Sequence, residues 1–157
     1  MHYLYIVYDS SDMASKKQNI AIASDHAGFE LKKILLREIE QLGFSAHDLG
    51  THNTDSVDYP DYANALAEWM KKNDGMGVLI CGSGIGISIA ANRHTHIRAA
   101  LCHDGLEAQL SRQHNDANVL CLGARIIGID AAKDCMKQFL HTEFEGGRHV
   151  KRVEKLG

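Results

Sequence analysis

The sequence predicts an α/β protein, a Rossmann-like three-layer αβα sandwich with a five-stranded parallel sheet. Short apolar segments alternate along the chain with segments of helical periodicity, the order that produces a parallel sheet. The apolar segments do not alternate with polar residues, as expected for strands covered by helices on both faces. The length of 157 residues is about that of one domain.

Each expected strand is a short apolar run bounded by polar residues or glycine, for example NIAIAS and MGVLIC. The five expected strands are Asn19–Ser24, Phe44–Leu49, Met76–Cys81, Ile97–Cys102 and Asn118–Leu122.

Each expected helix follows one of these strands. Between the first two, apolar residues recur at i, i+3 and i+4 from Leu31 to Leu42, and Gly43 closes the helix. Pro60 occupies a favoured first-turn position and opens a helix that runs to about Lys72. The other three helices are expected at about Ile85–Asn92, Asp104–Gln113 and Asp130–Leu140.

The domain organisation is expected to be simple. Residues 1–18 are predicted to be an N-terminal extension, and residues 19–157 a single domain that ends in a polar, partly basic and weakly helical tail. Neither an internal repeat nor a low-complexity tract interrupts the sequence.

Composition and charge exclude several functions. The formal net charge of −3 argues against a nucleic-acid or anionic-membrane partner. No apolar stretch approaches the ~20 residues of a membrane span, and the first residues make a poor signal peptide. The four cysteines form no C-x-x-C pair, so a zinc knuckle or thioredoxin-type site is not indicated. Reduced thiols favour a cytoplasmic location, and Cys102 and Cys121 are expected in the core.

The polar residues of interest follow the strands directly. Asp25 and His26 come after the first strand, and Cys81 ends the third. In an open parallel sheet, ligands bind at the carboxyl ends of the strands, beside the point where strand order reverses. We therefore expect a binding site at this edge.

The glycine-rich loop after Cys81, GSGIG, allows three readings. A Walker-type phosphate loop needs a lysine that is absent here, so that reading fails. A dinucleotide fingerprint needs a third glycine where Ile87 stands, which weakens the reading without eliminating it. The third reading is a catalytic thiol beside backbone donors.

The third interpretation, a catalytic thiol, agrees with the residues that are present in the loop. Unpaired N–H groups and the positive end of a helix favour a thiolate, which can act as nucleophile or general base. The glycines let the backbone approach a ligand, and Ser83 adds a hydroxyl donor. Taken alone, Cys81 is better explained as an inert cysteine buried at a tight turn, because most free cysteines are structural.

Further polar residues supply possible partners. His114 and Asn115 are expected in a short polar loop between a helix and a strand. Arg148 and Arg152 are four residues apart, so they share a face if the tail is helical and could together hold a phosphate. One thiol, one histidine and several arginines suit a phosphorylated sugar.

Five blocks in order carry a resemblance to a known family: DHAGFELK, DYPDYA, ICGSGIGISIAANR, SRQHNDANVLCLGAR and EGGRHVKRV. Together they resemble the RpiB-type ribose-5-phosphate isomerases, grouped with the galactose-6-phosphate isomerases of the LacA/LacB kind. The resemblance runs from about Asn19 to the C-terminus. It implies an aldose–ketose isomerase of the pentose phosphate pathway that uses neither metal nor organic cofactor.

The resemblance also implies roles for particular residues. Cys81 would be the base that moves a proton between C1 and C2, and His114 the acid that opens the furanose ring, with Asp25 assisting or binding a hydroxyl. Some members use a glutamate in the glycine loop, and the apolar Ile87 groups this chain with the cysteine-dependent members. The resemblance implies that the enediolate oxygens are held by the Ser83 hydroxyl and by the backbone amides of Gly82, Ser83, Gly84, Ile85 and Gly86. It implies that the phosphate is bound by His26, Arg148 and Arg152. Asn115 and Arg125 would line the pocket.

The family site lies between two subunits, so a homodimer, or a dimer of dimers, is implied. The loop with His114 would meet the partner subunit's cysteine. Two alternatives remain open: an isomerase of a 6-phosphohexose such as allose or galactose 6-phosphate, and a nucleotide-binding regulatory module in which Cys81 is inert.

Other histidines and charged runs have simpler explanations. His94 and His96 lack a third metal ligand and suit an exposed loop, and Asp104 suits a helix cap. No pattern marks His149 as functional. The short basic runs suit solvated helix faces.

Overall fold

The computed structural model describes residues 16–157, and most of the predicted extension of residues 1–18 lies outside this range. Five parallel strands form one sheet in the order β2-β1-β3-β5-β4. The predicted α/β class and five-stranded parallel sheet are confirmed. The strands are β1 (Asn19–Ser24), β2 (Ser45–Asp48), β3 (Met76–Cys81), β4 (Ala99–Leu101) and β5 (Val119–Gly123).

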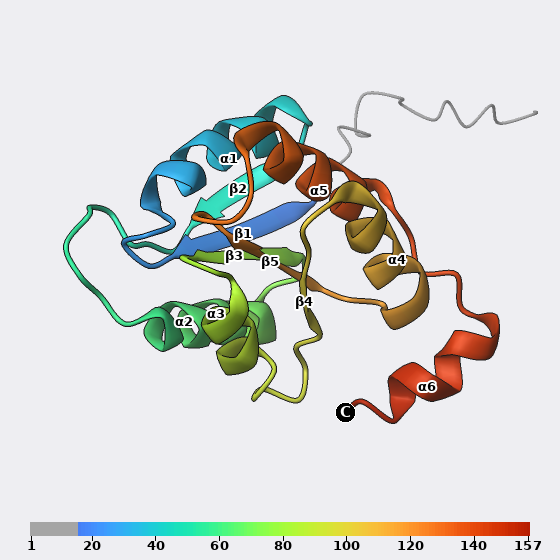
Figure 1. Cartoon of the computed structure of the whole chain (residues 1–157). Coiled ribbons are helices and arrows are strands. Elements are labelled where there is room, and N and C mark those ends of the chain that lie inside the picture. The colour runs from blue at the N-terminus through green and yellow to red at the C-terminus, as the bar shows by residue number, and fades with distance from the viewer. Residues whose placement is uncertain (1–15) are drawn as a thin grey trace, which may run out of the picture.

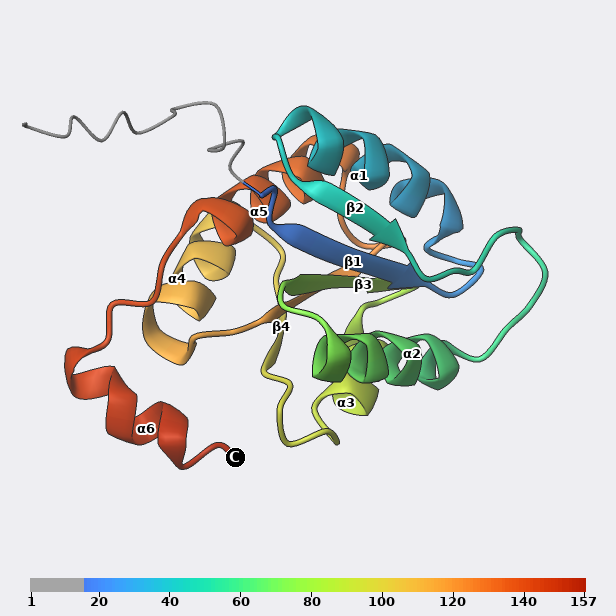
Figure 2. The ribbon, with the colours of Figure 1, turned by 180° about the vertical axis from the view of Figure 1, so that it is seen from behind.

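Helices cover both faces of the sheet, as Figures 1 and 2 show from opposite sides. α1, α4 and α5 lie on one face, and α2 and α3 lie on the other. The elements are α1 (Phe29–Gln41), α2 (Tyr59–Lys72), α3 (Ile85–Ala91), α4 (Gly105–Asn115), α5 (Ile129–His141), the 3₁₀ turn η2 (Gly147–His149) and α6 (Val150–Glu154).

The strand side chains divide between two cores because successive residues of a strand point to opposite faces. Ile20, Ile22 and Val78 pack on the α1 and α5 side, whereas Leu79 and Cys121 pack on the α2 and α3 side. All five of these side chains are fully buried, so the sheet is covered on both faces, as its apolar strands predicted.

Local sequence explains the ends of the helices. α1 is followed by Gly43, whose φ of 91° lies in the left-handed region that glycine adopts without a steric cost. Asp104 caps α4 by accepting a hydrogen bond from the backbone N–H of Glu107 at 2.9 Å. Pro60 lies in the first turn of α2, and Lys71 and Lys72 lie in its last turn, where cations are favourable.

The expected loop around His114 is wrong. α4 continues through His114 and Asn115 and ends at Asp116, a non-glycine residue with a φ of 45°. The Arg112 side chain donates to Asp116 Oδ1 at 3.0 Å and to the Ala117 carbonyl oxygen at 2.5 Å. These two contacts are local. Arg112 Nε also donates to the carbonyl oxygen of Thr142 at 3.1 Å, so a tertiary interaction helps to extend the helix beyond what its polar sequence suggests.

The sheet order identifies a switch point. From β1 the chain continues outward to β2, whereas β3 lies on the opposite side of β1. The crevice between the carboxyl ends of β1 and β3 is therefore where an open α/β sheet binds ligands. Asp25 follows β1 and Cys81 ends β3, so both residues flank this crevice.

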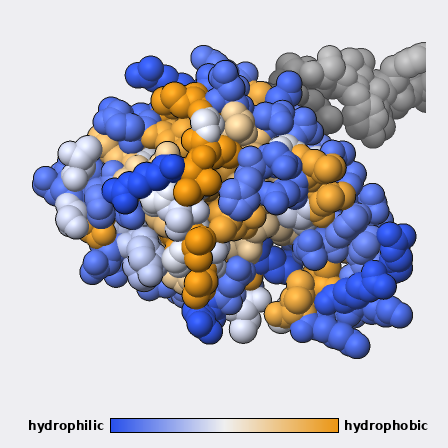
Figure 3. All heavy atoms as spheres, in the orientation of Figure 1, coloured by the Kyte–Doolittle hydropathy of each residue, from blue (hydrophilic) through white to orange (hydrophobic). Residues whose placement is uncertain are grey.

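Several large apolar side chains remain exposed. Figure 3 shows hydrophobic surface on the face that carries α3. The exposed fractions are 54% for Ile85 and 52% for Ile89 on α3, 64% for Leu106 on α4 and 63% for Ile126 after β5. Apolar surface gathered on one face is typical of a contact with another protein.

Candidate functional site

A cavity of about 530 Å³ opens at the switch point. It lies at the carboxyl edge of β1 and β3, where the sequence predicted a site. The lining residues are Asp25, Tyr59, Cys81, Gly82, Ser83, Ile85, Gly86, Arg125 and Ile126.

Cys81 lies at the base of this cavity. Its side chain is buried, and its Sγ accepts a hydrogen bond from the backbone N–H of Gly84 at 3.2 Å. The bond is possible because the chain reverses tightly at Gly84, which has a φ of 78° and precedes the first turn of α3. An N–H donor directed at sulfur stabilises negative charge there, as a thiol acting as a base requires.

The loop uses two of its amides internally. Gly84 donates to Cys81 Sγ, and the N–H of Ile85 donates to Ser83 Oγ at 3.2 Å. The resemblance implied that both amides hold a bound oxyanion, and in this structure each of them donates within the loop. Because Ser83 Oγ accepts from Ile85, its own O–H remains available as a donor. Gly82, Ser83 and Gly86 line the cavity and are the better candidates for amide donors.

Asp25 and His26 begin the turn after β1. The buried carboxylate of Asp25 accepts a hydrogen bond from the N–H of Gly28 at 3.1 Å and lines the cavity. His26 is half-buried, and its Nδ1 accepts a hydrogen bond from the backbone N–H of Val57 at 3.2 Å. In the neutral ring the proton is therefore on Nε2, which can donate to an anion.

Arg125 supplies positive charge at the cavity. The turn after β5 is tied to the glycine loop by backbone hydrogen bonds from Ala124 N to Cys81 O at 2.8 Å and from Arg125 N to Gly82 O at 2.9 Å. The Arg125 side chain packs against Gly82, where a Cβ atom would lie 3.4 Å from Nη1. These two backbone hydrogen bonds therefore keep the Arg125 guanidinium next to the glycine loop.

The other predicted residues lie at a second location. His114 and Asn115 are in the last turn of α4, near the amino end of β5, whereas Cys81 pairs with Gly123 at the carboxyl end of β5. Five strand residues separate the two edges by roughly 16 Å. Asn115 lines a different cavity, of about 430 Å³, together with Arg98 and Leu156.

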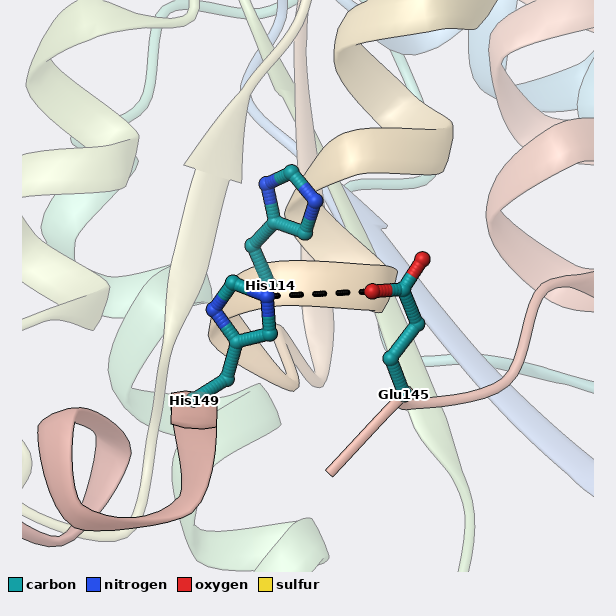
Figure 4. A group of neighbouring side chains, drawn as sticks. All are labelled: His114, Glu145 and His149. Carbon is teal, nitrogen blue, oxygen red and sulfur yellow. Dashed lines mark ion pairs between the residues drawn. The ribbon is translucent and has the colours of Figure 1, made fainter. Parts of the chain in front are cut away.

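His114 stacks on His149, as Figure 4 shows. The ring centroids are 4.5 Å apart and the rings are inclined by 15°. His149 is buried, and its Nε2 lies 3.7 Å from Glu145 Oε2, too far for a hydrogen bond. Burial, followed by the nearby Arg148, lowers the pKa of His149 and favours the neutral ring.

Arg148 and Arg152 are exposed beside this stack. Arg148 belongs to η2 and Arg152 to α6, which stands away from the sheet on the α4 side in Figures 1 and 2. In one chain, the predicted thiol therefore lies at one place, and the predicted imidazole and the two arginines lie together at another.

Some residues near the two places were not predicted. Tyr59 and Ile126 line the cavity, and Tyr59 packs so closely on Gly86 that a Cβ there would lie 2.6 Å from Cζ. His149 and Glu145 adjoin His114. Of these, Tyr59 had a sequence signal, since it lies in the DYPDYA block.

The fold and the site define an α/β protein with a thiol and backbone donors at the switch point of a parallel sheet. The family model described as Ribose/Galactose Isomerase matches residues 20–156, and the chain belongs to this family. The predicted family membership is confirmed.

Named relatives agree with this assignment. Ribose-5-phosphate isomerase B of Escherichia coli K12 is 46% identical over 141 residues, which cover 88% of this chain and 94% of that protein. The structure of ribose-5-phosphate isomerase B from Clostridium thermocellum is similar, with a TM-score of 0.87 and 47% identity, over 89% of this chain and 95% of the other. The structure of ribose-5-phosphate isomerase B from Mycoplasma genitalium with bound ribulose-5-phosphate has a TM-score of 0.85 and 42% identity to this chain. The match covers 88% of this chain and 93% of that one.

Across residues 16–157, no helix combines the length and the apolar character needed to cross a membrane.

Cys81 should be the most reactive cysteine towards iodoacetamide in the folded protein. Cys102, Cys121 and Cys135 are buried, and burial raises the pKa of Cys102 to about 12, that of Cys135 to about 11, and that of Cys121 as well. A raised pKa leaves almost no thiolate near pH 8, whereas Cys81 opens to the cavity beside an N–H donor. Peptide mass spectrometry after brief treatment should find the label on Cys81, and Cys81→Ser should take up almost none. Faster labelling of Cys102 or Cys135 would contradict this assignment.

Proposed function

We propose that this protein interconverts ribose 5-phosphate and ribulose 5-phosphate by cysteine-mediated proton transfer. The observation that carries the proposal is the hydrogen bond from Gly84 N–H to Cys81 Sγ at the base of the switch-point cavity. The similarity to ribose-5-phosphate isomerases, one of them with bound ribulose-5-phosphate, supports the substrate.

The reaction needs a base and a stabilised oxygen. With the aldose open, the Cys81 thiolate removes the proton from C2, and the C1 carbonyl becomes the oxygen of an enediolate. The proton of the C2 hydroxyl passes to the C1 oxygen, which becomes a hydroxyl. The Cys81 thiol then returns its proton to C1 as the C2 oxygen becomes the ketone carbonyl, which restores the thiolate. Ser83 Oγ–H and the amides of Gly82, Ser83 and Gly86 are the donors that stabilise the negative oxygen.

The sugar must first be opened and held. We assign the acid that opens the furanose ring to His114, with Asp25 binding a hydroxyl at the cavity. We assign the phosphate to His26, Arg148 and Arg152. The three phosphate ligands bind the substrate away from its reacting carbons, so their binding energy can orient C1 and C2 beside the thiol. Arg125 lines the switch-point cavity of its own chain, and we assign Asn115, the neighbour of His114, to the pocket of the partner chain.

The complete site requires two copies of the chain. Cys81 and His114 lie at opposite edges of the sheet, so one chain cannot bring both to one pentose. The apolar side chains exposed on α3 and α4, and after β5, offer a surface for a second copy. We propose a homodimer in which each cavity receives His114, Arg148 and Arg152 from its partner. A dimer of dimers would keep the same arrangement.

The cellular setting follows from the proposed substrate. We infer a role in the pentose phosphate pathway, in the cytoplasm, where the four free thiols of the chain remain reduced. We also propose residues 19–157 as the isomerase domain, with residues 1–18 as an extension.

Cys81→Ala should lower kcat for ribose 5-phosphate by about a thousandfold or more, because no other group replaces the base. Wild-type protein is first compared on ribose, allose and galactose phosphates, with ketose formation followed spectroscopically. Cys135→Ala is the control, since it removes a thiol on α5 outside the cavity. Circular dichroism should show an intact fold in both variants. Activity retained by Cys81→Ala would remove the base assignment.

Arg148→Ala should raise KM for ribose 5-phosphate by about tenfold or more, with a smaller change in kcat, because it removes a contact to the phosphate. Steady-state kinetics at fixed ionic strength provide the measurement. Lys151→Ala is the matched control, an exposed cation in the same tail. An unchanged KM in Arg148→Ala would place the phosphate elsewhere.

Mixing two inactive variants should restore activity if the site is shared. Cys81→Ala and His114→Ala, refolded together in equal amounts, should recover roughly a quarter of wild-type activity, since half the dimers are mixed and each mixed dimer has one intact site. Cys81→Ala mixed with Asp25→Ala should recover none, because both changes affect the same half of the site. Recovery absent from the first mixture would overturn the shared site.

A further inference from the structure

We propose that His114, Glu145 and His149 form a binding site for a divalent transition metal, with Zn²⁺ the best match. Each residue offers one ligand atom, and the three atoms lie within 4.8 Å of one another. Two imidazoles and one carboxylate are the ligands that zinc accepts in three-ligand sites, and they discriminate against Ca²⁺ and Mg²⁺, which prefer oxygen alone.

An independent observation supports a ligand at this place. His149 is 6% exposed, and its Nε2 is buried without a hydrogen-bond partner among the described residues. Buried polar nitrogens almost always have a partner, and an unpaired one needs an explanation. In Figure 4 this nitrogen faces Glu145, the remaining member of the cluster.

The backbone brings two of the ligands together. Gly146 and Gly147, with φ values of 67° and 56°, reverse the chain between Glu145 and His149. Glu145 is tied to α4 by a hydrogen bond from its N–H to the carbonyl oxygen of Gln113 at 3.1 Å. The Glu145 Oε2 to His149 Nε2 distance of 3.7 Å is close to the roughly 3.3 Å that separates ligands around tetrahedral zinc.

Metal binding requires one rearrangement. A metal lies in the plane of each imidazole that binds it, and the stacked rings of His114 and His149 have separate, nearly parallel planes. The His114 ring must therefore turn about its Cβ–Cγ bond, a torsion with broad, shallow wells. Arg148 and Arg152 add positive charge nearby and weaken the site, so we expect micromolar rather than structural affinity.

The site has a consequence for the reaction, which rests on the proposed function. A metal bound to His114 occupies the imidazole that opens the sugar ring and turns it out of its stack. Zn²⁺ should therefore inhibit isomerisation of ribose 5-phosphate, and a chelator should reverse the inhibition.

The binding test uses the full chain, stripped of metal with EDTA and titrated with ZnCl₂ in a calorimeter. We expect one Zn²⁺ per chain. Glu145→Gln should weaken binding by about tenfold or more, since it removes a charged ligand. Glu143→Gln is the matched control, an exposed carboxylate two residues away, and should bind as the wild type does. Equal binding by Glu145→Gln, or no binding by the wild type, would overturn the site.

Cys81 is the competing ligand and is tested separately. Cys81→Ser should retain the zinc affinity of the wild type, and loss of binding in this variant would assign the metal to the thiol instead. In activity assays, Glu145→Gln should keep its basal rate while its zinc inhibition shifts to about tenfold higher concentration or more. The calorimetry does not depend on activity, so failure of the proposed isomerase function would leave the metal site testable.

Discussion

The hydrogen bond from Gly84 N–H to Cys81 Sγ depends on an unusually close approach of two backbone segments. A Cβ at Gly84 would meet the Leu101 side chain at 2.5 Å and the Leu122 carbonyl carbon at 2.9 Å. A Cβ at Gly123 would overlap the Ser83 carbonyl oxygen. Glycine is therefore needed at both positions because a Cβ would not fit, and at Gly84 also because its φ is left-handed. The glycine loop is therefore shaped by its packing against the end of β5.

The residues around the cavity are positioned by this same packing. Because the turn after β5 bonds to Cys81 O and Gly82 O, the guanidinium of Arg125 stays beside the glycine loop. On the other side, Ser24 N donates to Gly50 O at 2.7 Å and Thr51 N to Ser24 O at 2.8 Å, which ties the loop after β2 to the end of β1. That loop also supplies the Val57 N–H that orients His26. The fully buried Lys32 pairs with Asp48 at the start of the loop.

The sequence predicted what depends on local pattern. Apolar strands, helical periodicity and a cysteine before glycines located β1, β3 and the carboxyl-edge cavity, including Asp25 and Ser83, whereas Arg125 was named only through the family resemblance. It missed Tyr59 as a lining residue and placed His114 in a loop. Both depend on tertiary contacts: Tyr59 packs on Gly86, and Arg112 in the last turn of α4 donates to the carbonyl oxygen of Thr142. His149 carried no pattern because its stacking on His114 requires the chain reversal at Gly146 and Gly147.

The separation of the two sets of residues has a thermodynamic consequence under the proposed dimer. The thiol is built on a central, fully covered strand, whereas His114 and the two arginines lie on the end of α4 and on the C-terminal tail. The thiol and the residues around it are placed by one folded chain. In the second set the two arginines are exposed and His114 is half-buried until a second copy binds. Activity is then linked to association, so it falls on dilution below the dimer dissociation constant even though each chain stays folded. Substrate that contacts both chains stabilises the dimer by the same linkage.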